Sequence, residues 1–199
     1  MHSFKVKSSK GEYSVSFIDS FKNSLEVELK DNDTIIIDKK ILKLYSNSFS
    51  KLKAKKIIIQ ATEENKSYEG LKLIIHNLIK NGFKKNHRLI AIGGGITQDI
   101  TSFTASIMFR GVQWIYFPTT LLAQGDSCIG SKTSINFQKF KNQIGGFYPP
   151  KKIFIDLHFL NTLSQHDLQS GFGEMSHYFV IAGKKEFDNF KKNYKNALN

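Results

Sequence analysis

Short apolar segments that alternate with helical patterns restrict the fold of this 199-residue chain more than any other feature of its sequence. Segments such as 89–92 are continuous runs of apolar residues, which is typical of strands buried on both faces of a parallel sheet. Residues 67–80, in contrast, place apolar side chains three and four positions apart and are followed by Asn-Gly, a pair that often ends a helix. We expect buried strands at residues 34–37, 56–59, 89–92, 112–117 and 153–156.

This alternation predicts an α/β fold whose first part, residues 1–163, is a Rossmann-like domain with a mostly parallel sheet. The pattern is helical in residues 164–199, so we expect this stretch to begin an α-helical C-terminal domain. Two helices bury little core, which suggests a chain that is truncated at its C-terminus. Weaker signals predict a short helix within 39–49 and an N-terminal hairpin of 4–7 with 13–18, which need not join the parallel sheet.

The chain is strongly basic, with a formal net charge of +12. Only Arg88 and Arg110 among its 29 basic residues are arginines, and the lysines are scattered along the sequence. Nucleic-acid-binding domains usually gather arginine and lysine on one face together with aromatic residues. The scattered pattern favours small anionic substrates, and we expect no nucleic-acid partner.

A single cysteine, Cys128, cannot form a disulfide within the chain, which favours a reducing compartment. The N-terminal residues lack the apolar core of a signal peptide, and no apolar run is long enough to span a membrane. Hydrophobic residues make up 40% of the chain, which is enough for a packed core. We therefore expect a soluble cytoplasmic protein with no membrane partner.

Three consecutive glycines, 93–95, follow one expected strand and precede a helical segment. At such a turn glycines allow backbone N–H groups to approach a pyrophosphate, and the helix dipole favours the negative charge. The spacing is not that of the usual dinucleotide-binding motif, so a tight turn without a ligand is the alternative. A phosphate loop at 125–133 is excluded because Ser131 separates Gly130 from Lys132.

The polar segment 118–146 contains the densest group of potential ligand-binding side chains. A solvated loop explains it equally well, and the sequence alone leaves both interpretations open. Glu174 and His177 lie three residues apart on an expected helix and so share one face, a spacing that metal ligands use but that surface pairs use more often. The polar side chains singled out in the segment are Thr119, Thr120, Asp126, Lys132, Lys141 and Asn142.

Six motifs follow one another along the chain: GGGITQD, FRGV, PTTLLAQGDSCIGSKTSIN, KNQIGGFYPP, IDLHFLNTL and GFGEM. In this order and spacing, over about residues 89–174, they resemble the 3-dehydroquinate synthase family of sugar-phosphate cyclases. The resemblance implies NAD bound in an N-terminal α/β domain. It also implies a divalent metal, zinc or cobalt, in the cleft before a helical C-terminal domain, and a homodimer that acts on a small sugar phosphate.

The resemblance implies roles for individual residues as well. Glu174 matches the first metal ligand, and Arg110 matches an arginine that reaches the substrate phosphate across a dimer interface, which suits a bidentate contact. His177 occupies the position of a substrate-contacting lysine. Substrate or nucleotide contacts match Asp126, Lys132, Lys141 and Asn142, and the NAD-contacting positions match Asp38, Glu63, Lys66, Gly94, Gly95, Asp99, Thr119, Thr120, Phe159 and Thr162.

The reaction implied by the resemblance converts 3-deoxy-arabino-heptulosonate 7-phosphate, a seven-carbon sugar phosphate, into a carbocycle with loss of phosphate. NAD oxidises a ring hydroxyl, and the ketone acidifies the adjacent C–H so that phosphate is eliminated. The hydride then returns from NADH before ring opening and aldol closure. The metal acts as a Lewis acid in this scheme. Such a lyase belongs to the shikimate pathway of aromatic amino acid biosynthesis.

Two departures from the family pattern leave other functions open. The family's two histidine metal ligands lie further downstream, whereas no histidine follows His177 here, and Glu174 alone is too few ligands for a catalytic zinc site. His177 itself stands where the family usually has lysine. The alternatives are a sister cyclase acting on sedoheptulose 7-phosphate, a metal-dependent polyol dehydrogenase, and an inactive nucleotide-binding fragment.

Overall fold

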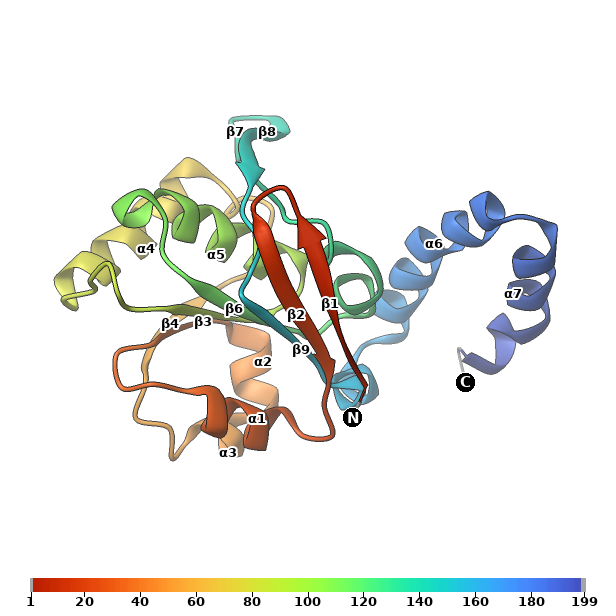
Figure 1. The fold of residues 1–199 in the computed structure, drawn as a ribbon, viewed down its shortest axis with the longest axis horizontal. Helices are drawn as coiled ribbons and strands as arrows, with labels where there is room; N and C mark the ends of the chain where they lie inside the picture. The colour runs from red at the N-terminus through yellow and green to blue at the C-terminus, as the bar shows by residue number, and fades with distance from the viewer. Residues whose placement is uncertain (1, 198–199) are drawn as a thin grey trace.

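One seven-stranded sheet forms the centre of the molecule in the computed structural model, which describes residues 2–197, the last three by their backbone only (Figure 1). β1 and β2 form an antiparallel hairpin at one edge, and the other neighbouring strands pair in parallel. The predicted α/β fold with a mostly parallel sheet is confirmed. In sheet order the strands are β1 (Ser3–Ser8), β2 (Gly11–Phe17), β9 (Lys152–Ile155), β6 (Trp114–Pro118), β5 (Leu89–Gly93), β3 (Thr34–Asp38) and β4 (Lys55–Ile59).

Helices cover both faces of the sheet (Figure 1). Successive side chains of a strand point to opposite faces, so Ile36 and Tyr116 belong to one core while Ile35 and Phe117 belong to the other. Every residue of β5 and β6 is buried as a result. No helix within residues 2–197 combines the length and the apolar character needed to cross a membrane. One layer holds α4 (Tyr68–Lys80) and α5 (Gly95–Ile107), and the other holds α1 (Phe21–Glu28), α2 (Lys39–Leu44) and α3 (Ser46–Phe49).

Three details differ from the sequence prediction. The N-terminal hairpin does belong to the sheet, because β2 pairs in parallel with β9 through Val15 and Ile153. The short helix expected within 39–49 is two helices, separated at Tyr45. Helix α1 has no counterpart in the prediction, since its eight residues are too few to establish a helical period.

The polar segment folds into regular structure and is therefore not a loop, although much of it is exposed to solvent. A short π-helical turn, Ala123–Ser127, is followed by the antiparallel strands β7 (Lys132–Phe137) and β8 (Phe140–Phe147), which form a second sheet of their own. All eight residues of β8 are exposed. β7 packs against α5, and the hairpin therefore lies beside that helix.

A pair of helices follows the sheet. α6 (Gln165–Ala182) leads away from the α/β part, and α7 (Lys184–Ala197) turns back beside it (Figure 1). The rings of Phe179 and Phe190 stack between them with centres 4.6 Å apart. The expected start of an α-helical region is thus present. The division into domains after residue 163 stays a prediction, and residues 1, 198 and 199 of its two ranges lie outside the described part.

Candidate functional site

The carboxyl ends of the parallel strands lie on one side of the sheet. The strand order changes direction between β3 and β5. β4, which follows β3 along the chain, pairs on one side of β3, whereas β5 pairs on the other. Ligands of open α/β sheets bind at such a switch point, in the crevice outside the carboxyl ends of the strands. Asp38, the last residue of β3, and the glycine turn 93–95 after β5 flank this position.

The glycine turn leaves the first turn of α5 without a side-chain cap. Gly94 precedes the helix and makes no capping bond, so amide N–H groups of the first turn are available to an anion. Space is available too, because a Cβ added at Gly95 would meet only Ser127 Oγ, at 3.7 Å, among the described residues. Helices α1, α4 and α6, in contrast, each have a side-chain cap, from Ser20, Ser67 and Ser164 respectively.

Thr119 and Thr120 follow β6 and form a wall beside the glycine turn. The Thr119 N–H donates to the Gly93 carbonyl oxygen at 3.0 Å, which holds the end of β6 against the turn. A Cβ added at Gly94 would lie 2.9 Å from Thr120 Cγ2, so the two segments are in close contact. The Thr119 hydroxyl is buried without a hydrogen-bond partner within residues 2–197. Buried hydroxyls are usually paired, so this one is a candidate for a bond to a ligand.

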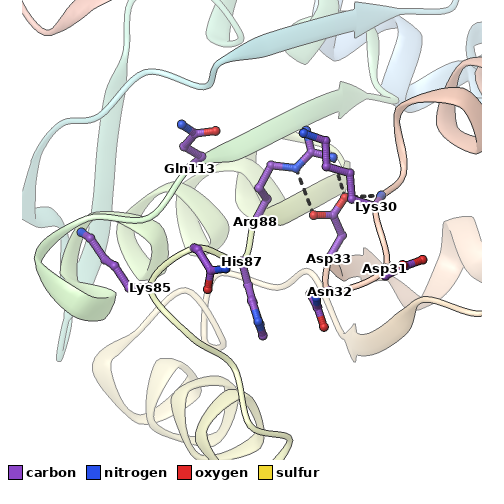
Figure 2. Close-up of a pocket in the computed structure, with 9 residues that line it drawn as sticks. Lys30, Asp31, Asn32, Asp33, Lys85, His87, Arg88 and Gln113 are labelled. Carbon is purple, nitrogen blue, oxygen red and sulfur yellow. Dashed lines mark hydrogen bonds and ion pairs between the residues drawn. The ribbon is translucent and has the colours of Figure 1, made fainter.

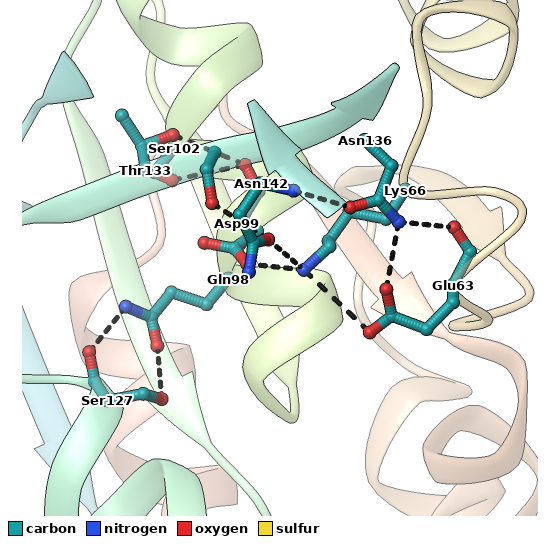
Figure 3. Close-up of polar contacts among 10 residues, drawn as sticks. Glu63, Lys66, Gln98, Asp99, Ser102, Ser127, Thr133, Asn136 and Asn142 are labelled. Atoms are coloured by element: carbon teal, nitrogen blue, oxygen red, sulfur yellow. Dashed lines mark hydrogen bonds and ion pairs between the residues drawn. The ribbon is translucent and has the colours of Figure 1, made fainter. Parts of the chain in front are cut away.

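A buried lysine lies near the same end of α5. Lys66, in the loop before α4, is only 5% exposed. Its ammonium group lies 2.8 Å from Asn142 Oδ1 and 3.2 Å from Asp99 Oδ2, with Glu63 Oε1 further away at 3.8 Å (Figure 3). A buried charge requires such partners. We call these four residues the Lys66 cluster.

Asp99 is the member of the Lys66 cluster whose pKa is shifted. Burial raises its pKa above the ordinary value of 3.8, and the nearby Lys66 lowers it without offsetting the burial. Asp99 lies four residues after Gly95, which is about 6 Å along the helix axis. A buried carboxyl group with a raised pKa and a specific charged partner is a common property of functional sites. A carboxylate near the N-terminus of a helix is also stabilised by the helix dipole, but that effect alone does not require a buried lysine beside it.

Other expected substrate contacts lie outside the Lys66 cluster. Lys132 and Lys141 are exposed, on β7 and β8 respectively. Asp126, on the π-helical turn, accepts a hydrogen bond from the Tyr178 hydroxyl of α6. This bond raises the pKa of Tyr178. The hairpin thus presents two cations to solvent, and Asp126 connects the turn to the helical pair.

Phe159 and Thr162 lie on the short 3-10 helix Leu157–Thr162 that follows β9. The Phe159 side chain is 1% exposed and packs against the rings of Phe21 and Tyr45, with centres 4.8 and 5.1 Å away. Its contact with a cofactor would therefore involve the backbone. The Thr162 hydroxyl is hydrogen-bonded to the Tyr45 hydroxyl at 2.9 Å.

Arg110 lies at the other end of α5 from the glycine turn. The helix has 13 residues, so its two ends are roughly 20 Å apart. Arg110 follows the helix, is exposed and has a left-handed backbone conformation with φ of 60°. It therefore does not reach the glycine turn of its own chain.

Glu174 and His177 share a face of α6, as expected, but they do not form a metal site. Both side chains are exposed, and the His177 Nδ1 atom contacts the carbonyl oxygen of Glu174 rather than its carboxylate. Residues 2–197 contain no group of three or more histidine, cysteine or acidic side chains that could hold a metal ion. The described residues thus do not fit a bound metal by themselves, because a catalytic zinc site uses about three protein ligands.

Comparison with known proteins identifies the family. The family model described as 3-dehydroquinate synthase N-terminal matches residues 56–170. The chain is 37% identical over 184 residues to the 3-dehydroquinate synthase of Clostridium tetani (strain Massachusetts / E88), and the match covers 89% of the chain. It belongs to the 3-dehydroquinate synthase family. The chain spans about half the length of such relatives, 49% in this case.

Two solved structures of sugar-phosphate cyclases resemble this member of the 3-dehydroquinate synthase family. One is 2-deoxy-scyllo-inosose synthase complexed with carbaglucose-6-phosphate, NAD⁺ and Co²⁺, with a TM-score of 0.75 and 26% identity over 87% of this chain and 50% of that one. The other is 2-epi-5-epi-valiolone synthase from Streptomyces hygroscopicus subsp. jinggangensis 5008, with NAD⁺ and Zn²⁺ bound. Its TM-score is 0.74, with 27% identity over 82% of this chain and 48% of that one.

Two polar contacts near the site involve residues that lie within the motifs of the 3-dehydroquinate synthase family but to which the sequence assigned no role. Gln98 and Ser127 exchange hydrogen bonds of 2.6 and 2.9 Å, which fasten the π-helical turn to α5 (Figure 3). Asn136 bonds to Glu63 and to the Asn142 backbone. Neither contact has a local signal, because the partners are separated by loops and helices that sequence spacing does not measure.

A hollow of about 470 Å³ lies at the opposite edge of the sheet, at the amino ends of β3 and β5 (Figure 2). Its centre is Arg88, whose guanidinium binds both carboxylate oxygens of Asp33 at 3.0 and 2.6 Å and Glu28 Oε1 at 2.7 Å. Lys152 adds a further bond to Glu28. We call these four residues the Arg88 cluster. Each nitrogen of its guanidinium is already engaged, so we assign the hollow a structural role; none of the family's expected site residues lines it.

Proposed function

We propose that the chain is the nucleotide-binding half of a sugar-phosphate cyclase of the 3-dehydroquinate synthase type. The observation that supports this best is the convergence, at the switch point of the sheet, of the uncapped start of α5 and the Lys66 cluster. The helix start provides amide donors for a pyrophosphate, and the cluster provides a buried cation with polar partners. NAD, once bound, supplies a hydride acceptor that is regenerated in each turnover.

The proposed cofactor contacts divide into three tasks. The backbone at Gly94 and Gly95 holds the pyrophosphate. The carboxylate of Asp38, at the end of β3, accepts hydrogen bonds from ribose hydroxyls and repels a 2′-phosphate, so the proposal is NAD rather than NADP. The unpaired Thr119 hydroxyl and the Lys66 ammonium group orient the remaining polar groups of the cofactor.

The proposed substrate is 3-deoxy-arabino-heptulosonate 7-phosphate, in the shikimate pathway of the cytoplasm. Lys132 and Lys141 are exposed cations on the hairpin, and we assign them to the anionic groups of the substrate. Asp126 accepts a hydrogen bond from a substrate hydroxyl, and His177 faces the substrate in place of the family's lysine. Glu174 contributes one metal ligand in this proposal, and residues 2–197 offer no group of three ligands that would complete a site around it.

Calorimetry tests the cofactor assignment on the 199-residue chain. We expect NAD to bind at least tenfold more tightly than NADP, and Asp38→Asn to remove most of this preference because the repulsion of the 2′-phosphate is lost. Asp31→Asn is the matched control, since Asp31 is an exposed carboxylate at the opposite edge of the sheet. Absence of NAD binding by the wild-type chain would refute the proposed function.

Phosphate release tests the substrate assignment in the protein as the cell makes it. With NAD and zinc or cobalt, 3-deoxy-arabino-heptulosonate 7-phosphate is expected to release phosphate, and Lys132→Ala to lower the rate at least a hundredfold. Lys139→Ala, an exposed lysine at the tip of the same hairpin, is the control. Release from sedoheptulose 7-phosphate alone would indicate a sister cyclase, and NADH accumulation with glycerol would indicate a polyol dehydrogenase.

The proposal includes a homodimer in which Arg110 serves the site of the other copy. Its distance from the glycine turn of its own chain supports this arrangement. Mixing inactive Arg110→Ala and Lys132→Ala proteins should restore activity, because one of the two sites in a mixed dimer then has both residues intact. If the mixture stays inactive although light scattering shows mixed dimers, Arg110 acts within its own chain or not at all.

A further inference from the structure

Asn136 occupies an irregular position of the β7–β8 hairpin. The strands pair regularly as far as Ile135 with Ile144 and again at Phe137 with Phe140, but the register shifts between these pairs. Asn136 therefore has no paired residue in the register of β7 with β8. Its backbone N–H donates instead to the Lys66 carbonyl oxygen at 2.8 Å, which attaches β7 to the loop before α4.

The Asn136 side chain makes three further bonds while being only 6% exposed. Its Nδ2 atom donates to the Glu63 carbonyl oxygen at 3.0 Å and to Glu63 Oε2 at 2.8 Å. Its Oδ1 atom accepts the backbone N–H of Asn142 at 3.0 Å (Figure 3). Each of these partners belongs to the Lys66 cluster.

An amide is the side chain that fits this position. It must donate to the two Glu63 oxygens and at the same time accept from an N–H, and asparagine combines both functions in one short, planar group. Asn142 needs the support because its φ of 56° is left-handed and it has no regular strand pairing. With its backbone fixed by Asn136, the Asn142 Oδ1 atom is placed 2.8 Å from the Lys66 ammonium group.

We infer that Asn136 is a positioning residue, which holds Glu63 and Asn142 in the geometry in which they and Lys66 bind the nucleotide. The inference rests on the proposed function for its ligand. Asn136 itself acts through these partners and not by contact with the cofactor, so its loss should weaken NAD binding without removing any group that touches NAD.

The decisive variant is Asn136→Asp, which preserves size and the acceptor oxygen but replaces the donor with a carboxylate oxygen facing Glu63. NAD affinity, measured by calorimetry well below the unfolding temperature of each protein, should fall at least tenfold. Gln138→Glu makes the same chemical change at an exposed position of the same hairpin and should change affinity less than twofold. Equal affinities for Asn136→Asp and wild type would overturn the inference.

A double-variant cycle separates positioning from a general effect on the hairpin. In a Glu63→Gln background, the new amide at position 63 can donate to the carboxylate introduced at position 136, so Asn136→Asp should then cost less than threefold in NAD affinity. A loss of tenfold or more in both backgrounds would contradict the inference, because it would show no coupling through Glu63.

Amide hydrogen exchange tests the same contact without any nucleotide. Asn136→Ala should accelerate exchange of the Asn142 N–H at least tenfold, whereas Asn136→Asp, which keeps the acceptor, should leave it within threefold of wild type. Unchanged exchange in Asn136→Ala would overturn the inference. If the wild-type chain binds no NAD, the proposed function fails, and the exchange experiment still decides whether Asn136 positions Asn142.

Discussion

Two ionic clusters, each formed around a buried cation, lie at opposite ends of the parallel strands of the same sheet, and they differ in how completely the cation is paired. In the Arg88 cluster a planar guanidinium forms bonds of 2.6 to 3.0 Å with two carboxylates, of which Figure 2 shows that of Asp33. These bonds, led by those to Asp33, raise the pKa of Arg88. In the Lys66 cluster a single ammonium group is shared among an amide and two carboxylates, one of them at 3.8 Å.

This difference in pairing suggests that one cluster stabilises the fold and the other binds a ligand. Every nitrogen of the rigid, planar Arg88 guanidinium is hydrogen-bonded within the protein, so no nitrogen remains for a ligand. A lysine with longer contacts, beside an Asp99 whose pKa is raised by burial, retains charge and bonding capacity that a ligand can use. We therefore assign a structural role to the Arg88 cluster, at the amino ends of the parallel strands. We assign a ligand-binding role to the Lys66 cluster, at their carboxyl ends.

The largest effect is expected from Arg88→Ala. It leaves Asp33, whose side chain is 2% exposed, as a buried charge without its partner, and breaking a buried pair in this way costs about 3–5 kcal/mol. Urea unfolding measures the change. Lys152→Ala, which removes a half-exposed partner of Glu28, should cost less than about 1 kcal/mol. Equal losses for the two variants would remove the distinction drawn for Arg88.

Lys66→Met should affect binding more than stability. Asp99 is partly hydrated, with 22% of its side chain exposed, so removal of its cation should cost only about 1–3 kcal/mol in the free energy of unfolding. NAD affinity should nevertheless fall at least tenfold in calorimetry. Arg88→Ala is the comparison, and it should retain NAD affinity at temperatures where it is folded.

The two clusters should respond to pH in opposite directions. Burial would raise the pKa of Glu28, but its bonds to Lys152 and Arg88 lower it below the ordinary value of 4.5. Its stabilisation is therefore present above about pH 4.5 and is lost as pH falls through the folded-state pKa. Asp99 has a raised pKa, so its contribution is full below pH 3.8 and is lost as pH rises through the folded-state pKa.

Amide variants isolate these two titrations. The unfolding free energy of wild type relative to Glu28→Gln should increase from pH 3 to pH 6, whereas that of wild type relative to Asp99→Asn should decrease over the same interval. Urea titrations at several pH values measure both differences. Slopes of the same sign would contradict the opposite pH dependence expected for Glu28 and Asp99.

The smallest effect is expected from Ser134→Ala. The Ser134 hydroxyl donates to Asn142 Oδ1 at 3.1 Å, but that oxygen keeps its shorter bond to Lys66. We expect less than about 1 kcal/mol in stability and less than threefold in NAD affinity. A tenfold loss of affinity would add Ser134 to the groups on which the Lys66 cluster depends.

The sequence by itself determined the α/β fold, the positions of the buried strands and the family. These features are local: an apolar run, a helical period and a glycine turn each lie within a few consecutive residues, so their spacing can be read directly. The same reasoning placed the N-terminal hairpin less well, because its pairing of β2 with β9 joins residues that are far apart in the sequence, such as Val15 and Ile153.

Only the tertiary structure decided which polar residues form a site. Nothing in the sequence shows that Lys66 is buried or that it contacts Asn142, 76 positions away. Asn136 appears in the sequence as one more polar residue, and its role arises because a register shift turns its backbone away from the hairpin. The physical reason is that burial and partner choice depend on how distant segments pack, and a buried charge is tolerated only where that packing brings its partners together.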